Sequence, residues 1–424
     1  MIKSAVVISE DKKFAEELCE KLTSYDTEIC NIGEYKNNGD FSVLDLSVTL
    51  QDIPNGNWHE LKNNYVDIVF EFFKRLFPKI KIRKWSSVVL IVPNCSNSCF
   101  GTATYLIEGM CKSFACEVAR YNTIVNCIEC KTNDHKRLAE LVSFFSDERA
   151  YMTGQVIKPD FSGIYHEEKE FSQPPVALIT GSGQGIGLSM VKELKNRGYL
   201  TCLNDIKLTE KIKSEIVETE SFNAVGDISD KSVTDELINR IVADCGHIDV
   251  FAANAAYMNM CSFEKLKKSD FDRHVDVNIQ GHFNCLSSVI PIMKKQRRGR
   301  IILFSSMFGT EGWKNAVAYA GTKTAMIGMG QYLSKKLADY GISVSIISPG
   351  VIDTPQLKSD ADDLKVSIDE VKKIYEKDIP LGRVGKPEDV AYLAGFLADG
   401  GADYLSGRIL QTNGGEVRST PEFI

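Results

Sequence analysis

Two side chains that could carry acid–base chemistry, Tyr319 and Lys323, lie four residues apart in the sequence. In a helix, this spacing places both side chains on the same face. A phenol with its ordinary pKa of about 10 transfers protons poorly at neutral pH, but an adjacent ammonium favours the phenolate and lowers that pKa. We therefore expect Tyr319 to act as a general acid toward a carbonyl or as a general base toward an alcohol.

A glycine-rich segment precedes this pair in the chain. Residues 177–187 read ALITGSGQGIG, an apolar strand pattern that runs into glycines at the start of a helix. Glycines tighten such a turn and let backbone N–H groups approach a pyrophosphate at the helix N-terminus. Asp205 follows the next strand pattern, at about the ~20-residue distance expected for an acid that binds a ribose hydroxyl. Together these features predict a dinucleotide site rather than a structural turn alone.

The elements that would position these residues alternate between strands and helices. Strands are expected at Val176–Thr180, Tyr199–Asn204, Ile248–Ala253, Arg300–Ser305, Ser343–Ser348 and Arg408–Gln411, and helices at Gly187–Asn196, Ala318–Ala338 and Val390–Leu397. Near-continuous apolar strands that alternate with helices are typical of a parallel sheet covered on both faces. The fold class is therefore α/β, with a doubly wound parallel sheet.

One short phrase occurs twice: YMTGQVI begins at Tyr151 and YLSGRIL begins at Tyr404. Other segments match in the same order, Val88–Pro93 with Ile301–Ser306 and Ala103–Tyr121 with Thr322–Tyr340. A shared order of similar segments predicts that the fold is present twice. We expect two Rossmann-like domains in tandem, at 1–160 and 176–424, with a polar, proline-containing linker at 161–175.

The second copy resembles the short-chain dehydrogenase/reductase family over about Val176–Gly415. The residues that carry the resemblance are the glycine loop Thr180, Gly181, Ser182, Gln184, Gly185, Ile186 and Gly187, then Asp205, Asp227, Ile228, Asn254 and Ala255, the set Asn278, Ser306, Tyr319 and Lys323, and finally Pro349, Gly350, Ile352 and Thr354. The chain has Ala253 and Ala256 where the family usually has Asn and Gly, so the packing of this strand end is expected to differ.

The resemblance implies a role for each group of residues. Asn278, Ser306, Tyr319 and Lys323 match the family's four catalytic residues, with Ser306 donating to the substrate oxygen and Asn278 in a water relay behind Lys323. Lys323 also holds the nicotinamide ribose. The glycine loop binds the pyrophosphate, Asp227 and Ile228 contact the adenine, and Pro349–Thr354 lies on the nicotinamide side. The implied cofactor is NAD(H), because Asp205 would repel a 2′-phosphate and Ser182–Gln184 supply no cation to neutralise it.

The first copy has lost these residues. When Tyr121 is aligned with Tyr340, Phe100 takes the place of Tyr319, Thr104 that of Lys323, and Val69 that of Asn278. The segment 8–15 contains no glycine, and the adenine-side segment between the second and fourth strands is missing. We interpret this copy as a pseudo-enzyme domain kept for packing, with an apolar helix face formed by Leu106, Met110, Phe114 and Val118.

The substrate stays open between several interpretations. A degenerate copy before an intact one is similar to 3-oxoacyl-carrier-protein reductases and to polyketide ketoreductase domains, which favours a ketone/alcohol oxidoreductase of the 3-oxoacyl thioester type. The segment IPLGRVGKPEDVAYLAGFLA at 379–398 fits sugar or polyol dehydrogenases equally well. A third interpretation, from another class, is a scaffold protein that keeps a nucleotide as a structural ligand.

Composition limits the partners. A net charge of −7 gives no bulk attraction to nucleic acid or to an anionic membrane, and no apolar run approaches the ~20 residues that span a bilayer. The 12 cysteines include the pairs Cys95/Cys99 and Cys127/Cys130, whose spacing does not build a four-ligand metal site. We expect no metal, reduced thiols in the cytoplasm, a small or carrier-bound carbonyl substrate, and a homodimer formed through the family's helix contacts.

Overall fold

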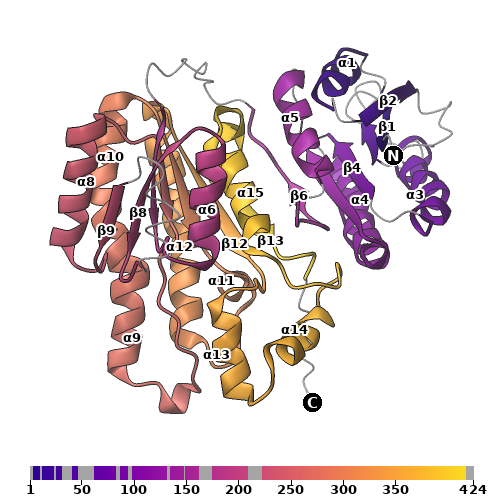
Figure 1. Ribbon diagram of the computed structural model, residues 1–424. Coiled ribbons are helices and arrows are strands. Elements are labelled where there is room, and N and C mark those ends of the chain that lie inside the picture. The colour runs from indigo at the N-terminus through magenta and orange to yellow at the C-terminus, as the bar shows by residue number, and fades with distance from the viewer. Residues whose placement is uncertain are drawn as a thin grey trace. The chain divides into compact units, whose positions relative to one another are not determined.

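The computed structural model describes residues 3–9, 12–22, 25–30, 41–45, 62–82, 86–93, 98–130, 134–147, 149–161, 174–208 and 222–416 (Figure 1). The chain divides into two compact units. Unit 1 contains residues 1–161 together with 373–384 and 413–424, and unit 2 contains residues 162–372 and 385–412. Most of the expected linker, the segment 8–15 in part, and Cys95 lie outside the described residues.

Unit 1 is built on a parallel sheet of six strands in the order β2-β1-β3-β4-β5-β6. Its elements are β1 (Lys3–Ile8), α1 (Lys12–Lys21), β2 (Tyr25–Cys30), β3 (Phe41–Asp45), a π-helix (Lys62–Val66), α3 (Asp67–Ile80), β4 (Ser86–Val92), α4 (Ser98–Val118), β5 (Thr123–Glu129), α5 (His135–Ser146) and β6 (Val156–Ile157). Every residue of β4 and β5 is buried, which explains why these strands read as continuous apolar runs.

Unit 2 carries a second parallel sheet, of seven strands in the order β13-β12-β11-β10-β7-β8-β9. Its strands are β7 (Val176–Thr180), β8 (Leu200–Asp205), β9 (Phe222–Val225), β10 (Val250–Ala253), β11 (Gly299–Phe304), β12 (Ile342–Pro349) and β13 (Ile409–Thr412). Its longer helices are α6 (Gly185–Asn196), α8 (Lys231–Cys245), α9 (Lys268–Val275), α10 (His282–Gln296), α12 (Val317–Leu337), α13 (Pro355–Leu364), α14 (Ile368–Glu376) and α15 (Pro387–Ala398).

The two sheets confirm the α/β fold class and its repetition. In each, the first strand of the unit lies inside the sheet and the chain winds away from it in both directions, as in doubly wound folds. Beside β7 and β8, unit 2 has the further strand β9, whereas β2 is the edge strand among the described residues of unit 1. β9 corresponds to the adenine-side segment that the sequence predicts to be missing from the first copy.

The apolar face of α4 packs inside unit 1. Val118 is fully buried in the unit 1 core, Met110 and Phe114 pack against that core, and the Phe114 ring stacks on Phe73 of α3 with 4.1 Å between centroids. Only Leu106 of the four expected residues is exposed, at 43%. Most of this apolar face is therefore buried within unit 1, in part against Phe73 of α3.

Two helices, α6 and α15, begin earlier in the structure than the sequence predicts. α6 begins at Gly185, two residues before the predicted start. α15 begins at Pro387 rather than Val390, with Pro at the first turn and the Asp389 side chain accepting from the Lys386 N–H. Among the described residues, no helix combines the length and the apolar character needed to cross a membrane.

Candidate active site

The glycine loop connects β7 to α6 and is shaped by close backbone contacts. Gly181 has φ +64°, and a Cβ atom there would lie 2.7 Å from the Ala255 Cα. A Cβ at Gly187 would overlap the Gly181 carbonyl oxygen. Gln184, at the N-cap of α6, makes no side-chain cap, so the first backbone N–H groups of the helix are not capped by that side chain and suit a phosphate.

Asp205 lies at the end of β8 and contacts this loop directly. Its Oδ2 accepts a hydrogen bond from the Gly183 N–H at 2.8 Å, and its Oδ1 accepts one from the Lys207 N–H at 3.2 Å. A Cβ at Gly183 would come within 2.9 Å of that Oδ2. The carboxylate is thus held against the loop, and only glycine at position 183 permits this approach.

A cavity of about 310 Å³ opens beside the loop and collects most of the predicted cofactor residues. Its lining contains Gly181, Gln184, Gly185, Ile186, Gly187, Asp205, Asp227, Ile228, Asn254, Ala255 and Thr354 from the predicted set. This donor set, with helix N–H groups beside one carboxylate and a second carboxylate farther along, fits the pyrophosphate, ribose and base of a dinucleotide.

The other predicted cofactor residues do not line this cavity; they are Thr180, Ser182, Tyr319, Lys323, Pro349, Gly350 and Ile352. Thr180 and Ser182 act from behind the loop. The Thr180 Oγ1 accepts from the N–H groups of Asn254 and Ala255, both at 3.2 Å, and the Ser182 Oγ donates to the Asn204 carbonyl at 3.2 Å. These buried hydroxyls fix the ends of β7, β8 and β10 relative to one another.

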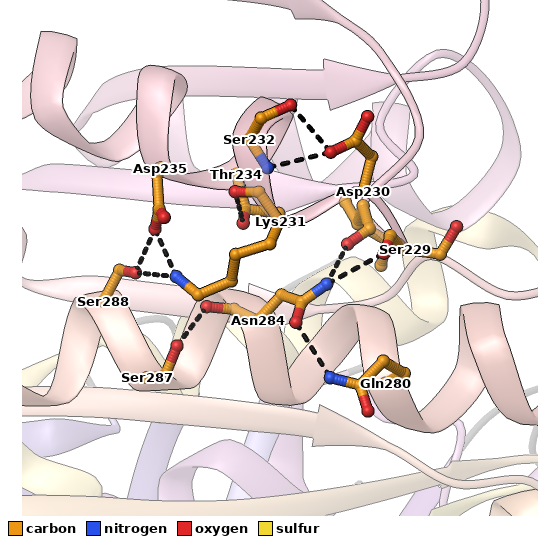
Figure 2. A network of polar contacts seen from close by, with 11 residues as sticks. Ser229, Asp230, Lys231, Ser232, Thr234, Asp235, Gln280, Asn284, Ser287 and Ser288 are labelled. Atoms are coloured by element: carbon orange, nitrogen blue, oxygen red, sulfur yellow. Dashed lines mark hydrogen bonds and ion pairs between the residues drawn. The ribbon is translucent and has the colours of Figure 1, made fainter.

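The cavity wall at Asp227 and Ile228, which we expect to face the adenine, is held by a polar network that Figure 2 shows. The Asn284 amide of α10 donates to the carbonyls of Ile228 and Ser229, each at 3.0 Å, and accepts from the Gln280 Nε2 at 2.9 Å. Behind it, Asp235 of α8 pairs with Lys231 and accepts from the Ser288 hydroxyl of α10 at 2.6 Å. The network joins α8 and α10 and thereby sets where Asp227 and Ile228 face the cavity.

Arg273 and Tyr257 line the same cavity, although no motif had pointed to them. The Arg273 guanidinium of α9 pairs with the Asp227 carboxylate at 2.6 Å and lies 5.9 Å from the centre of the Tyr257 ring. Burial acts to raise the pKa of Asp227, but hydrogen bonds from Ser229 and Arg273 outweigh it and lower that pKa. The sequence offered no signal for Arg273, because the fold alone brings α9 to the end of β9.

Asn278 sits in a π-helical segment, Asp276–Gly281, between α9 and α10. Its side chain is fully buried. The Oδ1 accepts from the Tyr257 N–H at 2.7 Å, and the Nδ2 donates to the Tyr257 carbonyl at 3.0 Å and to the Thr322 Oγ1 at 2.9 Å. Asn278 therefore ties the loop after β10 to α12, one residue before Lys323. π-helical turns recur at functional sites in proteins.

His282 of α10 supports the same region and was not predicted. It is fully buried, and its Nε2 lies 2.9 Å from the Ala255 carbonyl. Because a carbonyl only accepts, the Nε2 carries the proton. Burial, and then the charge of Lys323, lower the pKa of His282 to about 3, so the ring is neutral and holds a cavity-lining residue in place.

Ser306, Tyr319 and Lys323 meet at the ends of β11 and α12. Ser306 caps α11 (Met307–Glu311), where its Oγ accepts from the Phe308 N–H at 3.2 Å, and the same side chain acts to lower the pKa of Tyr319. The Phe308 ring meets the Tyr319 ring edge to face at 6.0 Å, and Trp313 stacks on Phe308 at 4.7 Å. One side of the phenol is thus bounded by aromatic rings.

The pKa values at this site correct one expectation from the sequence. Burial raises the pKa of Tyr319 to about 12, although the neighbouring Ser306 side chain acts to lower it. The Lys323 Nζ instead donates to the Phe304 carbonyl at 3.0 Å and lies 5.6 Å from the Tyr319 ring centre. Burial lowers the pKa of Lys323 to about 8. The ammonium is therefore not the dominant influence on the phenol in this structure, since desolvation of both groups outweighs their attraction.

The matching positions of unit 1 carry no such chemistry. Val69 of α3 is fully buried in the core, and Phe100 lies in the first turn of α4. Thr104 is buried, and its hydroxyl has no hydrogen-bond partner among the described residues. Within the described part of the chain, no group of three or more His, Cys, Asp or Glu side chains could hold a metal ion.

Comparison with known proteins places these features in context. The family model of short chain dehydrogenases matches residues 175–365. The chain is 32% identical over 244 residues to the 3-oxoacyl-[acyl-carrier-protein] reductase FabG of Staphylococcus epidermidis, which is 56% of this chain and 97% of that protein. It is also 32% identical over 247 residues to the FabG reductase of Thermotoga maritima, 57% of this chain and 97% of that protein. The solved structure of ElxO with NADP bound superposes with a TM-score of 0.54 at 27% identity, covering 57% of this chain and 99% of that one.

Proposed function

Because the chain belongs to the short-chain dehydrogenase family and is an oxidoreductase of CH–OH groups with a nicotinamide dinucleotide, we propose that it interconverts a ketone and a secondary alcohol with NAD(H), on a substrate of the 3-oxoacyl thioester type. The meeting of Ser306, Tyr319 and Lys323 at the ends of β11 and α12 carries this proposal. A protein that only stored a nucleotide would have no use for a phenol and a serine beside a buried lysine.

Each side chain has a role in the proposed reaction. The bound nicotinamide supplies or accepts the hydride. In the reductive direction, Tyr319 donates its proton to the carbonyl oxygen of the substrate, and Ser306 donates a hydrogen bond to the same oxygen as negative charge develops there. Lys323 supplies positive charge behind Tyr319, and Asn278 holds the Tyr257 loop against α12. Oxidation of an alcohol runs through the same groups with the proton moving to Tyr319.

Asp205 supports NAD(H) over NADP(H). Its carboxylate lines the cavity and is fixed by the Gly183 N–H, where a ribose 2′-OH could donate to it and a 2′-phosphate would be repelled. The FabG relatives support the 3-oxoacyl substrate class by their printed names alone. A carrier-bound substrate is therefore part of the proposal rather than a property read from the site.

Assembly and compartment follow as further parts of the proposal. Phe283 of α10 and Val317 and Tyr332 of α12 are 50%, 50% and 62% exposed, and apolar side chains on these helices would suit a homodimer. Cys111 and Cys127 are buried free thiols, which would suit the reducing cytoplasm.

The decisive experiment is a substrate screen. Purified chain is supplied with NADH or NADPH and with an acetoacetyl thioester, simple ketones and sugar ketones, and with NAD⁺ and polyols in the reverse direction. We expect NADH oxidation with the thioester and its loss in Tyr319→Phe. Faster turnover of polyols than of the thioester would favour the sugar or polyol dehydrogenase. Tight NADH binding without turnover of any substrate would favour the scaffold.

A further inference from the structure

Two short segments from the C-terminal part of the chain, 373–384 and 413–424, belong to unit 1. The residue at the centre of this contact is Tyr151, in the phrase that occurs twice. Its side chain is 1% exposed. The Tyr151 hydroxyl donates to the Arg383 carbonyl at 2.6 Å, and the Arg383 guanidinium lies 4.2 Å from the centre of the Tyr151 ring. Tyr151 thus contacts both the backbone and the side chain of Arg383.

The second segment meets Tyr151 through its backbone. The Gly414 N–H donates to the Tyr151 carbonyl at 3.3 Å, and the Leu381 N–H donates to the Gly414 carbonyl at 3.2 Å. Gly414 has φ +65°, and a Cβ there would lie 2.5 Å from the Tyr151 hydroxyl oxygen. A Cβ at Gly415, with φ +82°, would lie 2.5 Å from the Thr153 Cγ2. Both glycines are therefore needed for this close approach.

Residues 151–153 are themselves fixed to the unit 1 sheet. The Asn126 Nδ2 of β5 donates to the Met152 carbonyl at 2.8 Å, and the Val125 N–H donates to the Thr153 Oγ1 at 2.9 Å. Because β5 is buried along its whole length, this part of unit 1 is a rigid support rather than a loose loop.

The segment 373–384 is connected closely to residues that line the cofactor cavity. Thr354, Pro355 and Gln356 line the cofactor cavity, and α13 and α14 follow directly. The Nζ of Lys372 in α14 pairs at 2.5 Å with Asp353, the residue before the cavity residue Thr354. After the segment 373–384, the Gly385 N–H donates to the Val351 carbonyl at 3.0 Å. The residues on either side of the segment 373–384 are therefore both bonded to residues 351–353, which directly precede the cavity residue Thr354.

We propose that Tyr151 is a positioning residue: through Arg383 and Gly414 it anchors the segment 373–384, and so fixes the C-terminal end of the stretch that runs from the cavity residues 354–356 through α13 and α14 and that we expect to contact the substrate. This gives a role to a domain whose own Rossmann-like site is predicted from the sequence to have lost its function. A substrate-binding segment that is already anchored loses less conformational entropy when substrate binds. The free energy of binding is more favourable by the entropy cost that is avoided. The effect on KM rests on the proposed function, whereas the anchoring itself does not.

The test uses the full chain with Tyr151→Phe and Tyr151→Ala, and with Tyr121→Phe as a matched control, since Tyr121 lies beside the unit 1 core and not on this segment. Hydrogen exchange is followed at the amides of Leu381, Gly382 and Gly414, which the contact protects. We expect Tyr151→Phe to speed their exchange by roughly 2- to 12-fold, the worth of one hydrogen bond, and Tyr151→Ala to speed it further. Tyr121→Phe should leave these amides unchanged.

Steady-state kinetics supply the second readout. With circular dichroism unchanged, we expect KM for the ketone to rise in the order Tyr151→Phe, Tyr151→Ala, while kcat changes by less than about twofold because the groups around Tyr319 are untouched. Unchanged hydrogen exchange at all three amides would contradict the anchoring of the segment 373–384 by Tyr151. This experiment is informative even if the chain turns over no substrate. Faster exchange with an unchanged KM, or a fall in kcat alone, would overturn the positioning role.

Discussion

The Gly183 N–H donates to the Asp205 Oδ2 over 2.8 Å. The Asp205 carboxylate, which we expect to select the cofactor, thus also holds the glycine loop that we expect to bind it. Substitution of Asp205 should therefore have two separable effects, one on the shape of the loop and one on the charge that faces the ribose.

For cofactor choice, Asp205→Asn and Asp205→Ala are compared. Asn keeps an acceptor for the Gly183 N–H but removes the charge, while Ala removes both. We expect both variants to lower the NADH/NADPH ratio of kcat/KM by about tenfold or more, because a charge next to a phosphate costs over 1 kcal/mol. Only Ala should also weaken NADH binding. Equal kcat/KM values for the two cofactors in the unsubstituted chain would contradict the proposed preference.

For the proton donor, Tyr319→Phe should reduce turnover by roughly 10²- to 10⁴-fold, the usual contribution of a general acid. The Kd for NADH, measured by fluorescence, should change little because only the hydroxyl is lost. Lys323→Ala should harm both turnover and NADH binding. Substantial activity in Tyr319→Phe would show that another group donates the proton.

The buried Lys323 should leave a signature in the pH dependence of stability. Its pKa is lowered to about 8 in the folded chain, from its ordinary value of 10.5. Between these pH values the unfolded chain binds more protons than the folded one, so the free energy of unfolding rises with pH, by up to about 1.4 kcal/mol per unit. We expect urea unfolding between pH 8 and 10 to show this rise, and Lys323→Met to lack it. A parallel pH profile for the two chains would contradict the lowered pKa.

The pair Arg273–Asp227 should contribute to dinucleotide affinity. Arg273→Met removes the partner that helps to lower the pKa of Asp227 and frees that side chain at the adenine side of the cavity. Because both groups are partly exposed, the loss should be about 1 kcal/mol or less, a several-fold rise in the Kd for NADH with kcat little changed. Arg298→Met, which removes an ion pair with Asp249 away from the cavity, serves as the control.

Binding stoichiometry tests whether the first copy is decayed. Unit 1 has a buried Thr104 and Val69 at the positions of Lys323 and Asn278, and its described sheet lacks a counterpart of β9. We expect isothermal titration calorimetry to find one NAD(H) per chain. Two equivalents per chain would mean that unit 1 keeps a functional nucleotide site.

Much of the fold could be predicted because its signals are local. An apolar run such as Val176–Thr180 is a strand in any parallel sheet, and the sequence predicted it with the bounds that the structure gives. The glycines at 181–187 and the acid at the end of β8 also act over short distances, and the cavity contains most of them. Helix starts were less accurate, since the capping of α6 and α15 depends on backbone geometry at the first turn.

The tertiary structure decided what depends on distant residues meeting. The approach of Arg273 to Asp227, and of Tyr151 to Arg383, joins positions 46 and 232 residues apart, which no local pattern encodes. The pKa of Tyr319 was decided in the same way. The spacing from Lys323 was visible in the sequence, but the degree of burial and the direction of the Nζ toward the Phe304 carbonyl were not. Spacing along a helix determines which side chains share a face, whereas desolvation depends on everything that packs around them.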